Sequence, residues 1–163
     1  ISGILRGWNM IAFRERHYMA RQRLPDRRHT WRQKATIHDK DSGRPETFYV
    51  DFGEYEDGRL AEVFVTSHRM GDSFTRGTMD TLGRTISVGL QSGTSPHDMA
   101  HTLRGQNYPP LGRVEAAGSS VVACTSLADY IAQEILANYG ADGKRRLSDA
   151  GTDTETDGTA ATE

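Results

Sequence analysis

The alternation of apolar and polar residues is clearest between residues 48 and 65, where it predicts two paired β-strands. Apolar side chains at every second position from Phe48 to Phe52 give the period of a half-buried strand. Asp57-Gly58 follows as a turn, because Asp-Gly readily adopts the positive φ that a tight hairpin needs. Residues 60–65, with their β-branched and aromatic side chains, predict the returning strand. The chain is therefore expected to fold around a β-hairpin.

A second alternating stretch, Thr30–His38, predicts a strand that precedes the hairpin. The polar residues 39–45 between these strands indicate a turn. Together they predict a three-stranded antiparallel meander, which is about the smallest sheet that can cover a core with the help of helices.

Helical periodicity predicts three helices after this sheet. They are expected at residues 74–91, from Ser95 to Gly105, and at residues 126–138. Each begins beside a side chain that can cap a helix: Asp72 or Ser73, Ser95 and Ser126. The apolar face of the first helix consists of Phe74, Met79, Leu82, Ile86 and Leu90. The expected fold class is α+β, with two or three helices packed on one face of a three-stranded antiparallel sheet.

Three glycines, Gly77, Gly83 and Gly89, recur six residues apart in the first of these helices. Each costs up to about 1 kcal/mol relative to alanine in a helix interior. Three such residues in one helix predict close packing against the sheet or another helix, and close approach of a ligand is the alternative.

Both ends of the chain differ in composition from its middle. The first 23 residues have apolar positions near helical spacing and predict an amphipathic helix, which Pro25 ends. These positions are Ile4, Leu5, Trp8, Ile11, Ala12 and Met19. After Gly140 the sequence has almost no large apolar residue, which predicts disorder. The expected divisions are a basic N-terminal helix at 1–23, a domain at 24–140 and a disordered acidic tail at 141–163.

Composition limits the class of protein further. A chain of 163 residues is long enough for one domain with tails. It has no apolar run near the ~18 residues of a membrane span and no signal-peptide pattern at its start. We therefore expect a soluble, cytoplasmic protein with no membrane partner. The single cysteine, Cys124, excludes a disulfide within one chain and a redox step that needs two thiols of the same chain.

Charge is distributed unevenly along the chain. Residues 1–45 contain 11 Arg and Lys against 4 Asp and Glu, whereas residues 46–140 contain 6 against 12. A basic head on an acidic body indicates either pairing within the molecule or an anionic partner, including nucleic acid. Among the arginines of this head, Arg27, Arg28 and Arg32 are our candidates for contact with an anion or a partner. The alternative is a solvated connector that pairs with the acidic body.

Two motifs could carry metal or thiol chemistry. His97 and His101 have the four-residue spacing of metal ligands on a helix, but the sequence identifies no third ligand, so surface histidines are the preferred interpretation. Cys124 has small apolar neighbours, which favours a buried structural residue over a nucleophile.

A group of carboxylates lies at the predicted hairpin turn, namely Glu54, Glu56 and Asp57. An exposed turn would not raise the pKa of a carboxyl group for acid–base work, so we interpret all three as turn residues. The residues thus predict no catalytic, cofactor-binding or metal-binding site.

The segment from Leu24 to Tyr139 resembles the TSCPD domain, found near the C-terminus of adenosylcobalamin-dependent (class II) ribonucleotide reductases. Four pieces carry the resemblance: Leu24–Arg28, Gly53–Val65, Gly83–Gly93 and Thr125–Asp129. The second, with the sequence GEYEDGRLAEVFV, is the most specific of the four.

The departures from the family pattern also matter. The last piece reads TSLAD, so Leu127 and Ala128 stand where the family's name motif has Cys-Pro. Cysteines that some members carry before the hairpin and before the main helix are replaced here by other residues. A thiolate metal site of that kind cannot form in this chain, because such a site needs about four nitrogen or sulfur ligands.

The resemblance implies a role beside a reductase. Such reductases form a thiyl radical with adenosylcobalamin and use further thiols as reductant, whereas this chain has one cysteine and no barrel. The implied function is an accessory module of a class II ribonucleoside-diphosphate reductase system that supports deoxyribonucleotide synthesis but is not catalytic alone. Its partner would be the reductase catalytic chain, which would hold the adenosylcobalamin, and this chain would bind no cofactor.

Two other classes of function stay open on the sequence. One is a nucleic-acid or nucleotide-binding adaptor that uses the basic segment Arg14–Arg32. The other is a structural or oligomerisation module, in which the helix Trp8–Met19 packs on a second copy to form a homo-oligomer.

Overall fold

The computed structural model describes residues 20–67 and 73–146, and within them the chain forms five strands and three helices. In chain order they are β1 (His29–Asp39), β2 (Pro45–Glu54), β3 (Leu60–Ser67), α1 (Ser73–Gln91), α2 (Pro96–Leu103), β4 (Gly112–Glu115), β5 (Ala123–Cys124) and α3 (Leu127–Asn138). The strands form one sheet in the order β3-β2-β1-β4-β5, and every neighbouring pair is antiparallel. The α+β class and the meander of the first three strands are therefore confirmed.

The prediction of a three-stranded sheet was wrong, because two further strands extend the sheet beyond β1. Strand β4 pairs Val114 with Ile37, and β5 pairs Cys124 with Gly112. These strands are only four and two residues long, which is too short for an alternating pattern to stand out in the sequence. Strand β4 pairs with the long strand β1, and β5 pairs with β4, so tertiary pairing rather than local propensity creates them.

The hairpin between β2 and β3 turns at Asp57-Gly58, as predicted. Gly58 has a φ of 81°, which a residue with a side chain rarely adopts. One irregularity follows the turn: Gly53 pairs with Glu62 and Glu54 with Leu60, so the strand β3 carries one extra residue there. A β-bulge of this kind bends a strand and increases its twist.

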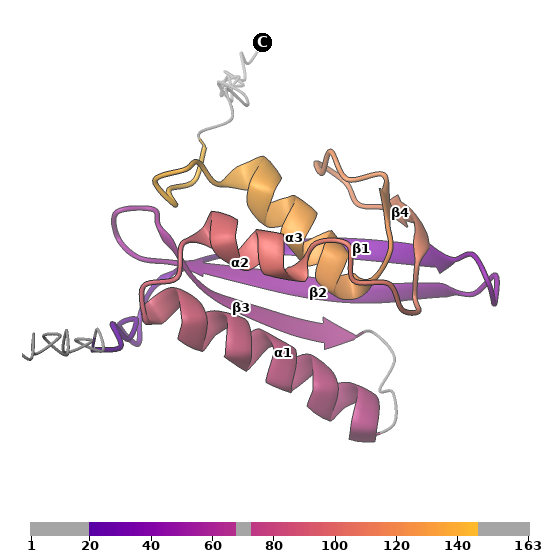
Figure 1. Ribbon diagram of the computed structural model, residues 1–163, viewed down its shortest axis with the longest axis horizontal. Helices are drawn as coiled ribbons and strands as arrows, with labels where there is room; N and C mark the ends of the chain where they lie inside the picture. The colour runs from indigo at the N-terminus through magenta and orange to yellow at the C-terminus, as the bar shows by residue number, and fades with distance from the viewer. Residues whose placement is uncertain (1–19, 68–72, 147–163) are drawn as a thin grey trace, which may run out of the picture.

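All three helices contribute to one core on the same face of the sheet. Figure 1 shows α2 and α3 lying over β1 and β2, and α1 running alongside β3. The buried side chains of the strands and helices form a single hydrophobic cluster. In α1 the buried positions include Met79, Ile86 and Leu90, whereas Phe74 is 80% exposed. The expectation that Phe74 faces the core was wrong, because the first turn of α1 stands clear of the other elements.

Helix α1 closes the free edge of the sheet as well as covering the core. The hydroxyl of Ser87 accepts a hydrogen bond from the backbone N–H of Val63 at 3.0 Å, and Gln91 Nε2 donates to the carbonyl oxygen of Ala61 at 3.1 Å. Gly83 allows this approach, since a Cβ there would lie 2.8 Å from the carbonyl oxygen of Val63. The outer strand β3 is thus supplied with partners that would otherwise be missing at an edge. Within the two described segments, no helix is long and apolar enough to cross a membrane.

The two ends of the described chain differ from expectation. Residues 20–23 are not helical, and the rest of the predicted N-terminal helix lies outside the described residues. Residues 141–146 do not form a disordered tail. The carbonyl oxygen of Gly143 accepts a hydrogen bond from Leu60 N–H at 3.1 Å, and the backbone of Lys144 forms an isolated antiparallel β-bridge with that of Arg59. This short extension pairs with the hairpin turn, and backbone pairing of this kind does not require apolar side chains. The remainder of the predicted tail lies outside the described residues.

We predict opposite effects on stability from two glycine substitutions in α1. Gly83→Ala should lower the free energy of unfolding by about 1–3 kcal/mol, because the new methyl group meets the backbone of β3. Gly77→Ala is the matched control, since a Cβ there meets nothing within 4 Å, and it should raise stability by up to about 1 kcal/mol. Urea unfolding followed by circular dichroism measures both. Equal effects of the two substitutions would contradict the close packing of α1 on β3.

Candidate functional site

The three candidate arginines lie in two separate places. Arg27 and Arg28 line a surface hollow of about 300 Å³ that also contains Pro25, His29, Glu54 and Glu56. Arg32 lies on the helix-free face of the sheet, where its guanidinium donates two hydrogen bonds to Asp51, at 2.6 and 2.8 Å. The structure therefore brings Arg27 and Arg28 together and places Arg32 in a different surface environment.

Two of these arginines are already paired with carboxylates. Arg28 Nε donates to Glu62, whose side chain is only 7% exposed, whereas the Arg32–Asp51 pair is much more open to solvent. Among the described residues Arg27 forms no ion pair, and it lies exposed at the rim of the hollow. Of the three, Arg27 is thus the residue with an uncommitted charge on the described surface.

The Arg28–Glu62 pair depends on a glycine in the neighbouring strand. Glu62 lies opposite Gly53 in the sheet, and a Cβ on Gly53 would come within 2.5 Å of the Glu62 Cγ atom. The Glu62 side chain therefore crosses over Gly53 before it meets Arg28. Any larger residue at position 53 would displace the carboxylate from this path.

The placement of Glu54 corrects one prediction. It is not an exposed turn residue but is only 5% exposed, and it continues the inward alternation of β2 that begins at Phe48. Its carboxylate accepts hydrogen bonds from Trp31 Nε1 at 3.1 Å, from the Tyr139 hydroxyl at 2.8 Å and from His29 Nδ1 at 2.9 Å. With three donors, Glu54 satisfies the requirement that a buried charge be hydrogen-bonded. The other two carboxylates fit the prediction, since Glu56 is exposed and Asp57 pairs with Arg59 at the turn.

Aromatic contacts extend the surroundings of Glu54. Trp31 stacks on Phe52 with ring centroids 4.3 Å apart, and the Arg145 guanidinium lies 4.7 Å from the Trp31 ring. Burial raises the pKa of the Tyr139 hydroxyl well above its ordinary value, so this group stays protonated and donates to Glu54. The cluster joins the first strand, the second strand and the end of the last helix. We assign Glu54 a structural role, because its three hydrogen bonds hold the side chain in place.

The hollow beside this cluster is suited to recognition. The His29 side chain is 62% exposed and lies beside Arg27 at the rim. Both can donate hydrogen bonds to a carboxylate or carbonyl oxygen of a partner. Within the described residues no group of three or more metal-ligating side chains is present, and His97 donates instead to the carbonyl oxygen of Tyr139 at 3.2 Å.

The TSLAD segment begins helix α3. The Ser126 hydroxyl accepts a hydrogen bond from the backbone N–H of Asp129 at 3.0 Å, which confirms the predicted cap. The Asp129 carboxylate in turn accepts from the N–H groups of Gly105 and Thr125, at 2.8 and 3.0 Å. Burial tends to raise the pKa of Asp129, but these N–H donors lower it below its ordinary value. The segment therefore ties the loop after α2 to the start of α3, and the sequence predicted the cap but not this second link.

Comparison with known proteins finds one domain family and relatives of one kind. The family model described as the TSCPD domain matches residues 17–139. The chain is 32% identical over 119 residues to the vitamin B12-dependent ribonucleotide reductase of Agrobacterium fabrum, and 31% identical over 119 residues to that of Bradyrhizobium diazoefficiens. Each alignment covers 73% of this chain and 9% of the relative. The corresponding protein of Rhodopirellula baltica is 28% identical over 113 residues, which cover 69% of this chain and 10% of the relative.

The chain thus spans about a tenth of the length of the curated relatives that it matches. No solved structure matches it at a significant level.

We predict that the two arginine pairs differ in their contribution to stability. Arg28→Ala should lower the free energy of unfolding by about 3 kcal/mol, because it leaves the buried Glu62 carboxylate without its partner. Arg32→Ala should cost much less than Arg28→Ala, since that pair is exposed to solvent. Adding Glu62→Gln to Arg28→Ala should recover part of the loss. If chemical denaturation gave equal losses for the two single variants, the burial of Glu62 would be wrong.

We predict that Cys124 reacts slowly and makes stability fall in alkaline solution. The thiol is buried, and burial raises its pKa from 9.0 to about 11. As the pH rises, the Cys124 thiol of the unfolded chain ionises before that of the folded chain. The contribution of the buried neutral thiol to the free energy of unfolding is therefore complete below about pH 9 and falls by up to about 3 kcal/mol as the pH rises towards 11.

The test compares the pH dependence of unfolding of the natural chain with that of Cys124→Ala. The alkaline loss in the natural chain should exceed that in the variant, and iodoacetamide should modify the native thiol much more slowly than the thiol in urea. Rapid alkylation of the folded protein near neutral pH would contradict the burial of the thiol.

Proposed function

The chain belongs to the TSCPD domain family, and from that membership we propose that it acts as an accessory module of a class II, adenosylcobalamin-dependent ribonucleotide reductase system. In this role it docks on a catalytic chain, supports deoxyribonucleotide synthesis in the cytoplasm and does not reduce nucleotides by itself.

The observation that carries this proposal is the match of this chain to the TSCPD domain model and to one region of B12-dependent ribonucleotide reductases. About nine-tenths of each named reductase lies outside the alignment, whereas most of this chain lies inside it. The matched region also builds a single core from its own strands and helices. A unit that folds around its own core beside a much larger chain is suited to docking and support.

The thiol chemistry of this chain supports a non-catalytic role. The thiolate is the reactive form of cysteine, and Cys124 is buried with its pKa raised by that burial. The TSLAD segment uses its polar residues to begin a helix, so Ser126 and Asp129 are engaged in backbone hydrogen bonds. These residues act in folding rather than in electron transfer.

The cobalamin named in the relatives belongs, in this proposal, to the catalytic chain. The described hollows are surface depressions that do not enclose so large a cofactor. One is charged and has a volume of about 300 Å³, another is lined by residues of α1 alone, and a third of about 420 Å³ lies on the outer side of β1. We therefore derive no step of the reaction through residues of this chain.

Docking is assigned to the rim of the hollow at Arg27. Arg28 and Arg32 are held by Glu62 and Asp51, so their charges are largely neutralised by neighbours. Arg27 and the exposed edge of His29 face solvent together. The same pairing gives less support to a nucleic-acid adaptor, which would need several uncommitted cations. That alternative and the oligomerisation module stay predictions, the latter because the helix Trp8–Met19 lies outside the described residues.

The test uses a B12-dependent reductase chain from which the region that matches this protein has been removed. Added in trans, this chain should bind the shortened reductase in isothermal titration calorimetry and raise its rate of ribonucleotide reduction. Arg27→Glu should weaken binding by about tenfold, or ~1.4 kcal/mol, because it reverses the charge at the rim. Arg104→Glu, the same change at an exposed arginine that follows α2, is the control and should bind normally.

Two results would overturn the proposal. One is the absence of binding together with unchanged turnover of the shortened reductase. The other is reduction of ribonucleotides by this chain alone. Equal weakening by both arginine variants would instead leave the accessory role intact and remove only the assignment of docking to Arg27.

A further inference from the structure

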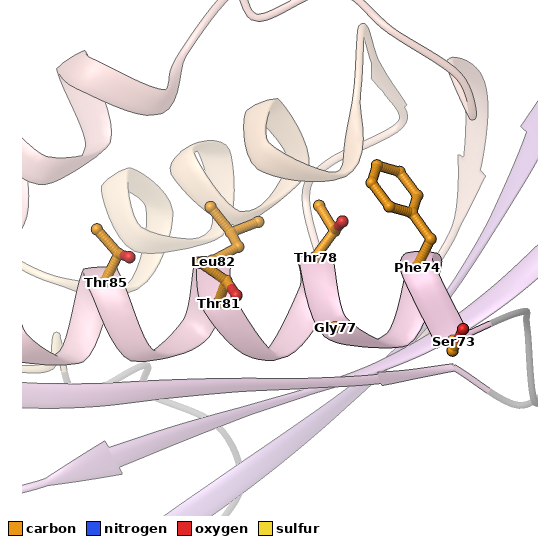
Figure 2. Close-up of a pocket in the computed structure, with 7 residues that line it drawn as sticks. All are labelled: Ser73, Phe74, Gly77, Thr78, Thr81, Leu82 and Thr85. Carbon is orange, nitrogen blue, oxygen red and sulfur yellow. The ribbon is translucent and has the colours of Figure 1, made fainter.

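The outer side of helix α1 is uncharged, which is unusual for a helix at the surface. Figure 2 shows the side chains of Phe74, Thr78, Leu82 and Thr85 projecting in a row from one side of α1. Together with Gly77 and Thr81 they line a shallow depression on the helix. The threonines are polar, as is normal for the solvent-facing side of a surface helix, but the exposed Phe74 ring is not, so a covering element would stabilise this face.

The exposed side chains of α1 and the positions of its charged residues support a covered outer face. Phe74 is 80% exposed and Val88 is 42% exposed, and both lie on the side of α1 away from the buried stripe. The charges of the helix instead follow its flank, where Arg84 pairs with Asp80 one turn away at 2.9 Å. The outer face therefore offers aromatic, aliphatic and methyl-bearing threonine groups with no charge among them.

The chain that precedes the sheet reaches this helix at its C-terminal end. Arg21 Nε donates to the Gln91 side chain at 2.8 Å, and the backbone N–H of Gln22 donates to the Gln91 carbonyl oxygen at 2.8 Å. The hydroxyl of Tyr55 donates to the Gln22 carbonyl oxygen and fixes the same segment from the hairpin side. Residue 20 therefore lies beside the last turn of α1, and the chain before it starts from that point.

We propose that residues 4–19 pack as an amphipathic helix along the outer face of α1, parallel to it. A helix of 16 residues is about 24 Å long, close to the ~28 Å of the 19-residue α1. Its apolar stripe, which includes Trp8 and Ile11, then covers Phe74 and Leu82, while its arginines remain in water. The occupant of the face is thus a segment of the same chain rather than a partner.

This inference is independent of the proposed accessory role. The family match begins at residue 17, so most of the covering segment lies outside the part of the chain that defines the family. Docking on a reductase could fail while the segment still covers α1, and the reverse is equally possible.

The test places a nitroxide spin label in the covering segment of the full chain. Asn9→Cys introduces a polar-side attachment point, and the natural Cys124 is buried, so the new thiol should take the label selectively. In the ¹⁵N–¹H spectrum the label should broaden the amide signals of residues 74–85 strongly and those of β4 and β5 little. Phe74→Lys with Thr78→Lys should abolish the selective broadening, since both residues are exposed on this face, whereas Val122→Lys, at another exposed apolar residue, should leave it unchanged.

Three results would overturn the proposal. One is broadening that is no stronger on α1 than elsewhere. The second is broadening of α1 that persists in the Phe74→Lys, Thr78→Lys variant. The third is broadening that arises only between molecules. It is tested by mixing spin-labelled protein at natural nitrogen abundance with ¹⁵N-labelled protein that carries no spin label, and its occurrence would assign the face to a second copy.

Discussion

Helix α1 completes the sheet by supplying hydrogen-bond partners to its outermost strand. Ser87 and Gln91 bond the backbone of β3 with side chains, and Gly83 lets the helix come close enough for them to reach. The same helix places its apolar residues in the common core. An open strand edge would otherwise invite pairing with another chain, so the integrity of this domain as a folded unit depends on this contact.

Sequence reasoning succeeded where a pattern was long. The alternation from Phe48 to Phe52 placed the hairpin correctly, and Ser126 was correctly identified as a helix cap. It failed for β4 and β5, which are too short to show a period; β4 forms by pairing with β1, and β5 by pairing with β4. In α1 the glycines six residues apart predicted close packing, which Gly83 confirms. The residues that contact β3, however, are Gly83, Ser87 and Gln91, which are four apart and therefore share one helical face.

Only part of the candidate site could be predicted from the sequence, because many of its contacts join residues that are far apart in the chain. The acidic residues beside Glu54 predict a turn residue, although its position continues the inward alternation of β2. Its donors come from distant points of the chain, Trp31 in β1 and Tyr139 after α3, so no local pattern announces them. Arg27, Arg28 and Arg32 are alike in the sequence and differ only through the carboxylates that folding brings to two of them.

The path of Glu62 over Gly53 has a consequence for how this sequence can evolve. Position 53 tolerates no side chain while Glu62 occupies the space above it, and Glu62 in turn requires the cation at position 28. A larger residue at position 53 is therefore accommodated most easily together with a shorter residue at position 62. Among related sequences the three positions should co-vary as a unit, with small residues at position 53 accompanying long acidic residues at position 62.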